Sequence, residues 1–393
     1  MPPMMRIPSV VAAAMLALAA CGGQAAAPSS PAAASKPSSA AAPASVSTSA
    51  SPSAKPAASS QWTPELQKII DAANKEGELD ISWGEPTLGG TEGAKLFEAG
   101  INKTFGTNIK INFTPGPSQP EIAGKIVTEE KAGEKAVSDV FVGAGTSVVT
   151  LVGANALATV NWPALLPGRI PQEVSEQNLA VRVITGIPGI EYNTNIVKGD
   201  MIPKTMQDVL KPEWKGKFAT TPYAAGFDYL IAKEMWGPEK TIDYVKQLSG
   251  QLAGLMRCGE NQHISSGEFP AFGLDCDGTS YYTAQKQGAP IGQVIPLDSA
   301  QKRWFYLAVP KNAAHPNAAT LYTVFSQMPN GQSLSYQTWG SDEDSYPESK
   351  THAKIDELTK QGAKFFGPTI QYLADHPEMK GEVDQMVKIL TSK

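Results

Sequence analysis

The chain has 393 residues, with 33 basic and 38 acidic side chains and a net charge of −5. Arg6, Lys36 and Lys55 are basic and no acidic residue precedes residue 61, so the body from residue 61 carries a net charge of −8. An acidic body without a basic stripe argues against a nucleic-acid partner. A body of roughly 330 residues also exceeds what one hydrophobic core usually serves, which predicts two lobes.

The first 20 residues read as an export signal. Arg6 precedes an apolar stretch at residues 7–20, which is shorter than the ~20 apolar residues that span a bilayer. The LAACG sequence of residues 18–22 resembles the bacterial lipobox, in which the cysteine, here Cys21, is lipidated and becomes the mature N-terminus. The alternative is an ordinary secretory signal that happens to contain a cysteine.

Residues 21–60 are predicted to form a stalk behind the lipid anchor. They are almost entirely Ala, Ser, Pro and Gly, with no acidic residue. Such a segment has too few large apolar side chains to offset the entropy of ordering the chain. The composition alone is equally that of a tail without a role; the preceding lipobox favours a stalk.

The body alternates helical and strand-like segments. Thr63 and Pro64 predict a helix start, and Gly77 predicts its end. A strand–helix–strand order is typical of a parallel sheet covered by helices, whose ligands bind beyond the carboxyl ends of the strands. The loops to search are therefore residues 84–90, 143–147 and 220–228. The expected strands are residues 79–83, 109–113 and 139–142, and the expected helices that follow the first one are residues 96–105 and 121–131.

Two cysteines remain in the body. Cys258 and Cys276 form an even pair, and in an oxidising compartment an even pair predicts one disulfide. Their spacing matches no zinc motif, and no CxxC redox motif is present in the sequence.

Six segments in order resemble the bacterial extracellular solute-binding proteins, in particular the branch that contains the periplasmic ferric-ion-binding proteins. No single segment is decisive, but together they extend over most of the body. They are ANKEGEL at residues 73–79, SDVFV at 138–142, EYNTN at 191–195, the PEWKGK stretch within 203–218, GAP with VIP between 288 and 296, and HPNAA at 315–319.

The resemblance implies a type II periplasmic-binding-protein fold, which is an α/β fold. Each of its two lobes is a mixed, mostly parallel sheet flanked by helices, and the lobes close on a ligand by hinge motion. The crossings between lobes are expected near residues 182–186 and 295–304. Lobe 1 is then expected at residues 61–184, lobe 2 at 185–296, and the second part of lobe 1 with the C-terminal helices at 297–393.

Tyr281 and Tyr282 resemble the adjacent tyrosines that supply iron ligands in the ferric-binding members. Phenolate oxygens suit a hard trivalent cation. However, the loops after Trp83 and Val142 lack the histidine and the glutamate that the resemblance implies, and only Glu85 could substitute. An organic ligand or a metal chelate is therefore expected rather than bare ferric ion. Ferric binding, and a purely packing role for both tyrosines, remain as alternatives.

Other ligand-binding residues are expected from the three loops. The loop at residues 143–147 could bind an anionic oxygen at a helix start, or be an ordinary turn. Aromatic and polar side chains on the other two loops have the usual composition of a small-molecule site, although Trp83 and Tyr223 could equally be core residues. The expected residues are Trp83, Glu85, Thr87, Gly145, Thr146, Ser147, Thr221, Tyr223 and Asp228.

The function predicted is the extracytoplasmic substrate-binding component of an ABC importer, with a small-molecule or ion ligand. It would be a monomer without cofactor or catalysis, would touch the membrane only through its lipid anchor, and would deliver the ligand to an ABC permease. A secreted hydrolase is the rival, but the sequence has neither GxSxG nor HExxH and only four histidines. A sensor lobe for a separate signalling protein is the third possibility. The identity of the ligand is left open.

Overall fold

The computed structural model describes residues 61–392, so the expected signal peptide, Cys21 and the whole stalk lie outside the described residues. The described residues form one compact unit with mixed helices and strands. The two largest of its four hydrophobic clusters organise it, one built mainly from residues before 185 and after 304, the other from residues 190–294 and the last helix. We call the parts around them the first and the second lobe.

The first lobe begins with α1 (Pro64–Glu76), β1 (Glu78–Trp83), α2 (Gly90–Phe105) and β2 (Lys110–Pro115). The Thr63 hydroxyl accepts the Leu66 N–H at 3.1 Å, Pro64 opens α1, and Gly77 ends it with φ 71°. The predicted start and end of this helix are therefore confirmed. β1 and β2 pair in parallel, with Leu79 opposite Ile111.

Helix α2 starts six residues before the predicted residue 96. Glu85 lies in the preceding loop, and its carboxylate accepts both the backbone N–H of Thr91 (3.1 Å) and the Thr91 hydroxyl (3.2 Å), which caps the first turn. The glycines of this turn masked the helical pattern. Gly93 is required there because the Leu88 carbonyl leaves no room for a Cβ atom.

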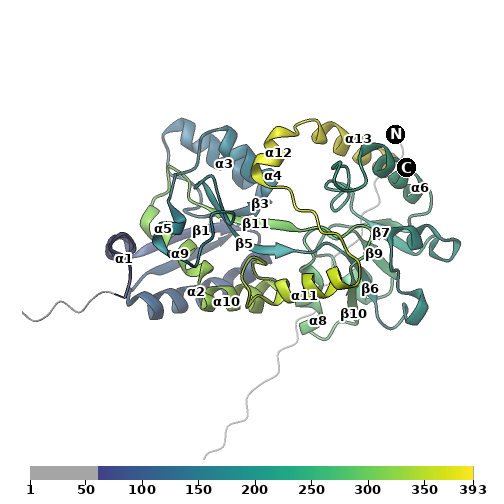
Figure 1. The fold of residues 1–393 in the computed structure, drawn as a ribbon, viewed down its shortest axis with the longest axis horizontal. Coiled ribbons are helices and arrows are strands. Elements are labelled where there is room, and N and C mark those ends of the chain that lie inside the picture. Colours follow the sequence, from purple (N-terminus) through teal and green to yellow (C-terminus); the bar gives the residue numbers. More distant parts are fainter. Residues whose placement is uncertain (1–60, 393) are drawn as a thin grey trace, which may run out of the picture. The chain divides into compact units, whose positions relative to one another are not determined.

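A four-stranded sheet completes the first lobe, in the order β3-β11-β5-β4. The strand predicted at residues 139–142 begins later, at Phe141, because the side chains of Ser138 and Asp139 bond to neighbouring segments. Helices cover the sheet, and α1 packs against α9 (Figure 1). The remaining elements are α3 (Gln119–Ala132), β3 (Phe141–Ala144), α4 (Gly145–Gly153), α5 (Trp162–Leu165), β4 (Ser175–Glu176), β5 (Ala180–Gly186), β11 (Arg303–Ala308), α9 (Pro316–Gln327) and α10 (Pro329–Trp339).

The second lobe has a five-stranded sheet in the order β10-β6-β9-β7-β8. Its core is rich in aliphatic and aromatic side chains such as Phe218, Phe227 and Tyr244. The elements are β6 (Ile190–Asn193), η2 (Gly199–Met201), η3 (Met206–Leu210), η4 (Pro212–Trp214), β7 (Phe218–Thr220), α6 (Pro238–Ser249), β8 (Gly254–Leu255), α7 (Gln262–Ser265), β9 (Ala271–Gly273), α8 (Ser280–Lys286) and β10 (Ile291–Val294).

The expected predominance of parallel pairing is corrected. Within residues 61–392, five of the eight strand pairings are antiparallel. The reason lies in the crossings: β5 leaves the first lobe and β11 returns to it, so these neighbours must run in opposite directions. In the second lobe β6 arrives and β10 leaves, with the same result.

The C-terminal helices divide between the cores. The segment after α11 (Lys350–Lys360) passes the start of β11, where the Phe366 carbonyl accepts the Lys302 N–H at 2.7 Å. Helix α12 (Ile370–Asp375) then packs on α4, and α13 (Met379–Thr391) packs on α6 (Figure 1). Among the described residues, none of these helices has the length and hydropathy needed to cross a membrane.

Candidate functional site

The two crossing strands place an arginine at the junction of the lobes. Arg303 opens β11 and pairs with Gly186, the last residue of β5. Its Nη2 donates to Asp228 Oδ1 of the second lobe at 2.5 Å, and its guanidinium lies 4.1 Å from the centre of the Tyr229 ring. Burial opposes the charge of Arg303, but Asp228, Tyr229 and Asp277 together outweigh it, so the pKa of Arg303 is raised. Arg303 and Asp228 therefore form an ion pair between the lobes.

Three carboxylates lie at the second-lobe side of the junction: Glu191, Asp275 and Asp277. Burial raises the pKa of all three, that of Glu191 to about 7. Glu191 accepts the Ser280 hydroxyl at 2.7 Å, and Asp275 accepts the Gly189 N–H. Of these three, Asp277 acts on Arg303 together with Asp228, so this cation has two acidic neighbours.

The adjacent tyrosines occupy different environments. The Tyr282 ring lies 5.7 Å from that of Tyr336 on α10, edge to face, so it bridges the two lobes. Lys286, also on α8, donates to the Gln337 carbonyl of α10 at 3.1 Å. Tyr281 packs instead against the apolar residues of its own lobe, and burial raises its pKa to about 12. Of the pair, Tyr282 has the position expected of a residue at the cleft.

The loop after β7 carries three of the expected residues. Tyr223 is 42% exposed, and its hydroxyl oxygen accepts the Cys258 N–H at 2.9 Å. Cys258 and Cys276 form a disulfide, as predicted. Thr221 is buried, and its hydroxyl accepts the Ala225 N–H at 3.0 Å, which shapes the loop.

The expected residues of the first lobe do not converge with these. Trp83 is only 2% exposed, and its indole N–H donates to the Thr87 carbonyl at 3.0 Å, so its place is in the core rather than at the cleft. Thr87 is likewise buried, and Glu85 caps α2.

The expected anion-binding loop is covered. Helix α4 begins at Gly145 itself, and a Cβ there would lie 2.9 Å from a methyl group of Leu373 on α12. Ser147 is 5% exposed, while Thr146 remains exposed. Since α12 lies over this helix start, the loop is a packed strand-to-helix turn.

The sequence analysis did not identify Arg303 or Asp277 as residues of the junction, nor the contact that a C-terminal helix makes with the second lobe. Tyr372 on α12 donates its hydroxyl to Glu234 of the second lobe at 2.7 Å, which adds a contact between the lobes. The one available signal was Arg303 itself, because a charged residue at the start of the otherwise apolar RWFYLAV stretch of residues 303–309 is unusual.

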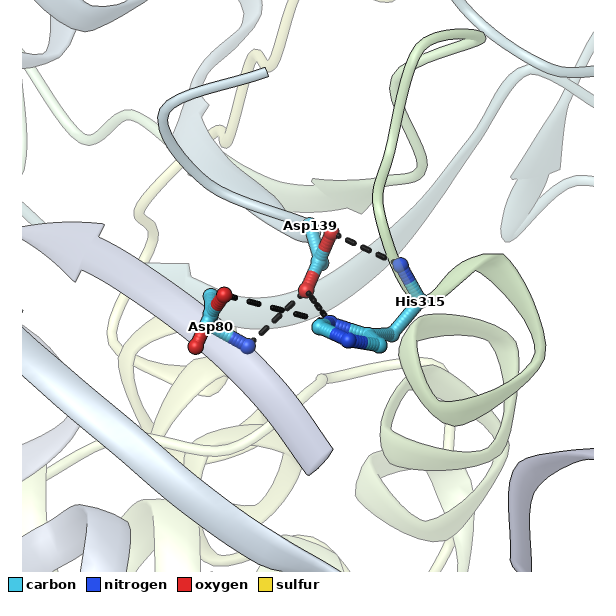
Figure 2. Close-up of side chains that lie close together, drawn as sticks. All are labelled: Asp80, Asp139 and His315. Atoms are coloured by element: carbon cyan, nitrogen blue, oxygen red, sulfur yellow. Dashed lines mark hydrogen bonds and ion pairs between the residues drawn. The ribbon is translucent and has the colours of Figure 1, made fainter. Parts of the chain in front are cut away.

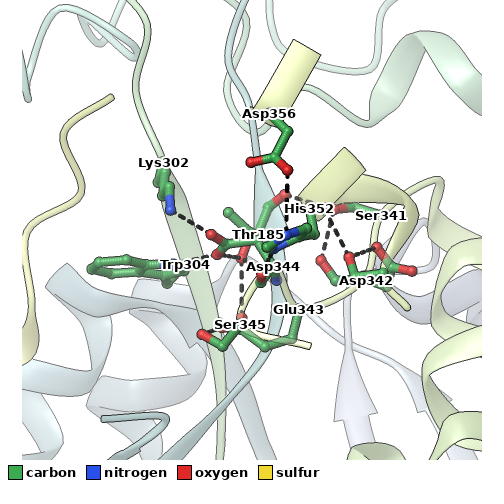
Figure 3. A network of polar contacts seen from close by, with 11 residues as sticks. Thr185, Lys302, Trp304, Ser341, Asp342, Glu343, Asp344, Ser345, His352 and Asp356 are labelled. Carbon is green, nitrogen blue, oxygen red and sulfur yellow. Dashed lines mark hydrogen bonds and ion pairs between the residues drawn. The ribbon is translucent and has the colours of Figure 1, made fainter. Parts of the chain in front are cut away.

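A polar network ties the segment at residues 341–346 to the crossing strands (Figure 3). The Thr185 hydroxyl bonds to Asp344 (2.7 Å) and Glu343 (3.0 Å), and Lys302 pairs with Asp344. Burial raises the pKa of Glu343 to about 7, whereas Lys302 lowers that of Asp344 against the effect of burial. The members bond mainly to one another, so the network fixes the backbone of the junction.

Asp80, Asp139 and His315 form a cluster of possible metal ligands, whose ligand atoms lie within 4.8 Å of one another (Figure 2). The Asp139 carboxylate already bonds to the backbone N–H groups of Asp80 (2.8 Å), Ala314 (2.5 Å) and His315 (3.0 Å) and to His315 Nδ1 (2.8 Å). With its oxygens engaged in this way, the cluster joins β1 to the start of α9. It is a structural clasp rather than a metal site.

Two cavities lie away from the ion pair. One of about 350 Å³ is lined by α6 and Gln207, and one of about 170 Å³ lies between α10 and the start of α11. The first is surrounded by charged side chains such as Glu239 and Asp243 on the outer face of α6. The ion pair and the tyrosines that bridge the lobes are the better candidates for a solute site, because both lobes contribute to them.

Comparisons with known proteins agree with this architecture. Residues 95–341 match the family model described as bacterial extracellular solute-binding protein. The Fe(3+)-binding periplasmic protein of Serratia marcescens is 26% identical over 147 residues, which are 37% of this chain and 42% of that protein, so less than half of the relative's length is matched.

Two solved structures show the same fold. The substrate-binding protein of an ABC transporter from Agrobacterium tumefaciens has a TM-score of 0.65 at 17% identity, covering 80% of this chain and 94% of its own. Iron-bound HitA from Pseudomonas aeruginosa has a TM-score of 0.61 at 17% identity, covering 79% and 99%. The fold is thus the predicted type II periplasmic-binding-protein fold.

The family model covers more than half of the chain, and its description is that of extracellular proteins that bind a solute. The chain therefore belongs to the bacterial extracellular solute-binding proteins.

Proposed function

We propose that the protein is the substrate-binding component of an ABC importer, which captures a small solute between its lobes and delivers it to a membrane permease. The observation that carries this proposal is the junction, where Arg303 of one lobe pairs with Asp228 of the other and Tyr282 meets Tyr336. Contacts made across a hinge form or break as the lobes move, so a solute bound there is coupled to closure. No catalytic step is proposed.

The residues proposed to line the site are Asp228, Tyr282 and Tyr223, all on the second lobe. Tyr223 is the most exposed of them and adjoins the disulfide. Glu85 and Thr146 are exposed in the first lobe, but Glu85 caps α2 and Thr146 lies in a packed turn, so neither is proposed to line the site.

Ferric-ion binding is the second candidate, since one relative is named for it and the adjacent tyrosines match the expected motif. One observation opposes it. Tyr281 packs with apolar residues of the second lobe, so the two adjacent tyrosines do not face one common site. An organic solute therefore fits better.

The attachment to the membrane is a further part of the proposal. A signal at residues 1–20, a lipid on Cys21 and a stalk to residue 60 would hold the lobes near the permease while leaving them free to move. Lobe 1 would comprise residues 61–184 and 297–393, and lobe 2 residues 185–296. The binding protein would act as a monomer.

Native mass spectrometry of protein purified without denaturation tests the function. A solute at one copy per chain, released intact on acidification, is the expected result. A protein that never carries or binds a solute, or that converts the solute chemically, contradicts the proposal.

A further inference from the structure

Unpartnered buried polar atoms gather where the chain crosses between the lobes. Among the described residues, eleven buried side-chain nitrogen or oxygen atoms have no hydrogen-bond partner. Three of them, on Ser299, Gln301 and Arg303, lie on the crossing into β11, and a fourth is the hydroxyl of Thr220 at the end of β7. Buried polar groups normally have hydrogen-bond partners, so a group of unpartnered ones in this segment indicates that a polar ligand binds there.

Arg303 is the charged member of this group. Its side chain is 8% exposed, and Nε has no partner although Nη2 is bonded to Asp228. A guanidinium recognises a carboxylate best through two parallel N–H donors, and Nε is one of the donors such a fork uses. The geometry thus leaves a donor of Arg303 for an anionic group.

Asp228 supplies the opposite charge beside it. Its side chain is 19% exposed, and the bonds that it accepts, from Arg303 and from the Tyr229 N–H, both end on Oδ1. The second oxygen can therefore accept from an ammonium group. The ring of Tyr229, which is 2% exposed, packs against the guanidinium of Arg303.

We propose that the Arg303–Asp228 pair recognises a small organic zwitterion, with the solute's carboxylate on Arg303 and its amino group on Asp228. This rests on the proposed solute-binding function and names the substrate class of the same site. A dianion would face Asp228 and the nearby Asp277, and a simple amine would leave the Arg303 donor unpaired. A solute with both charges satisfies both side chains.

Matched probes test the charge requirement on the exported full-length protein. Thermal unfolding and calorimetry would compare 4-aminobutyrate with butylamine and butyrate, and alanine with ethylamine and propionate. We expect at least one zwitterion to raise the unfolding temperature and to bind at least tenfold more tightly than both of its single-charge analogues. No shift with either zwitterion, or equal binding of a single-charge analogue, overturns the inference.

Substitutions then assign the charges. Arg303→Gln and Asp228→Asn should each weaken the zwitterion at least tenfold, and Arg303→Lys, which loses the fork, should not restore it. Lys380→Gln is the control, since Lys380 forms an exposed ion pair with Asp384 within α13. If Arg303→Gln fails to fold by circular dichroism, the more exposed Asp228→Asn carries the test. Unchanged affinity in a folded Asp228→Asn or Arg303→Gln variant refutes the inference.

The same measurements separate this inference from the proposed function. A tightly bound co-purifying solute that lacks either charge refutes the zwitterion inference but is consistent with the importer function. A protein that binds no solute at all refutes both the zwitterion inference and the importer function.

Discussion

The disulfide allows a worked prediction about stability and binding. Cys258 and Cys276 are separated by 18 residues in the sequence. Closing a loop of that length stabilises the folded state by about 3 kcal/mol in the chain-entropy model. The unfolding entropy of a body of roughly 330 residues converts this into a fall in melting temperature of about 4 °C when both cysteines become serine.

Ligand affinity should change much less. Tyr223 is anchored by the backbone N–H of Cys258, which serine retains, so the loop keeps its hydrogen bond. We expect a loss of affinity of no more than about threefold, or roughly 0.7 kcal/mol. Calorimetry with the co-purified solute and melting curves of the residue 61–393 body would give both quantities. The wild-type body with dithiothreitol is the control and should melt at the temperature of the double variant.

Two results would refute this reasoning. One is the titration of two free thiols in the unfolded, unreduced body. The other is an unchanged melting temperature together with a more than tenfold loss of affinity. That result would mean that the disulfide belongs to the solute site and does not stabilise the fold.

Three other predictions concern the junction and the membrane anchor. Burial raises the pKa of Glu191 from 4.5 to about 7, so the folded state keeps this proton to a higher pH than the unfolded state does. The free energy of unfolding should therefore fall as the pH rises from about 5 to 8. In urea titrations, Glu191→Gln should flatten this pH dependence, and an unchanged pH dependence would contradict the prediction. Tyr282→Ala should weaken binding of the co-purified solute about thirtyfold, which is about 2 kcal/mol, mainly through faster release. Tyr281→Ala should instead mainly lower the stability of the folded protein. Ferric salts should produce no visible charge-transfer band, and an orange iron-loaded protein would restore the ferric alternative. Cys21→Ser should move the protein from the membrane fraction to the soluble exported fraction, and a variant still bound after a high-salt wash would exclude the lipid anchor.

Sequence patterns located the local elements well because their causes are local. The Thr63 cap, the Gly77 terminus and the cysteine pair each depend on neighbouring residues or on composition. The motifs around Asp139 and His315 were recognised separately, and the structure shows that they bond to each other. The two family-like motifs therefore belong to one hydrogen-bonded cluster, which joins segments that are distant in the sequence.

The site was harder to predict because its parts come from distant segments. Arg303 and Asp228 are 75 residues apart, and nothing between them indicates that they meet. Trp83 and Gly145 follow strands as ligand residues often do, yet core packing and α12 cover them. Whether a loop is open or covered depends on tertiary packing, which periodicity does not report.

The central claim is that the two lobes close on a solute, and the distance between the lobes tests it most directly. Cysteines replacing the exposed Lys95 on α2 and Lys246 on α6 would carry a donor and an acceptor dye, and Lys95 with Lys131 on α3 gives a control pair within one lobe. We expect energy transfer between the lobes to rise when the co-purified solute is added back to the stripped protein, while energy transfer within the control pair stays constant. A solute that binds tightly without changing the transfer between the lobes would contradict it.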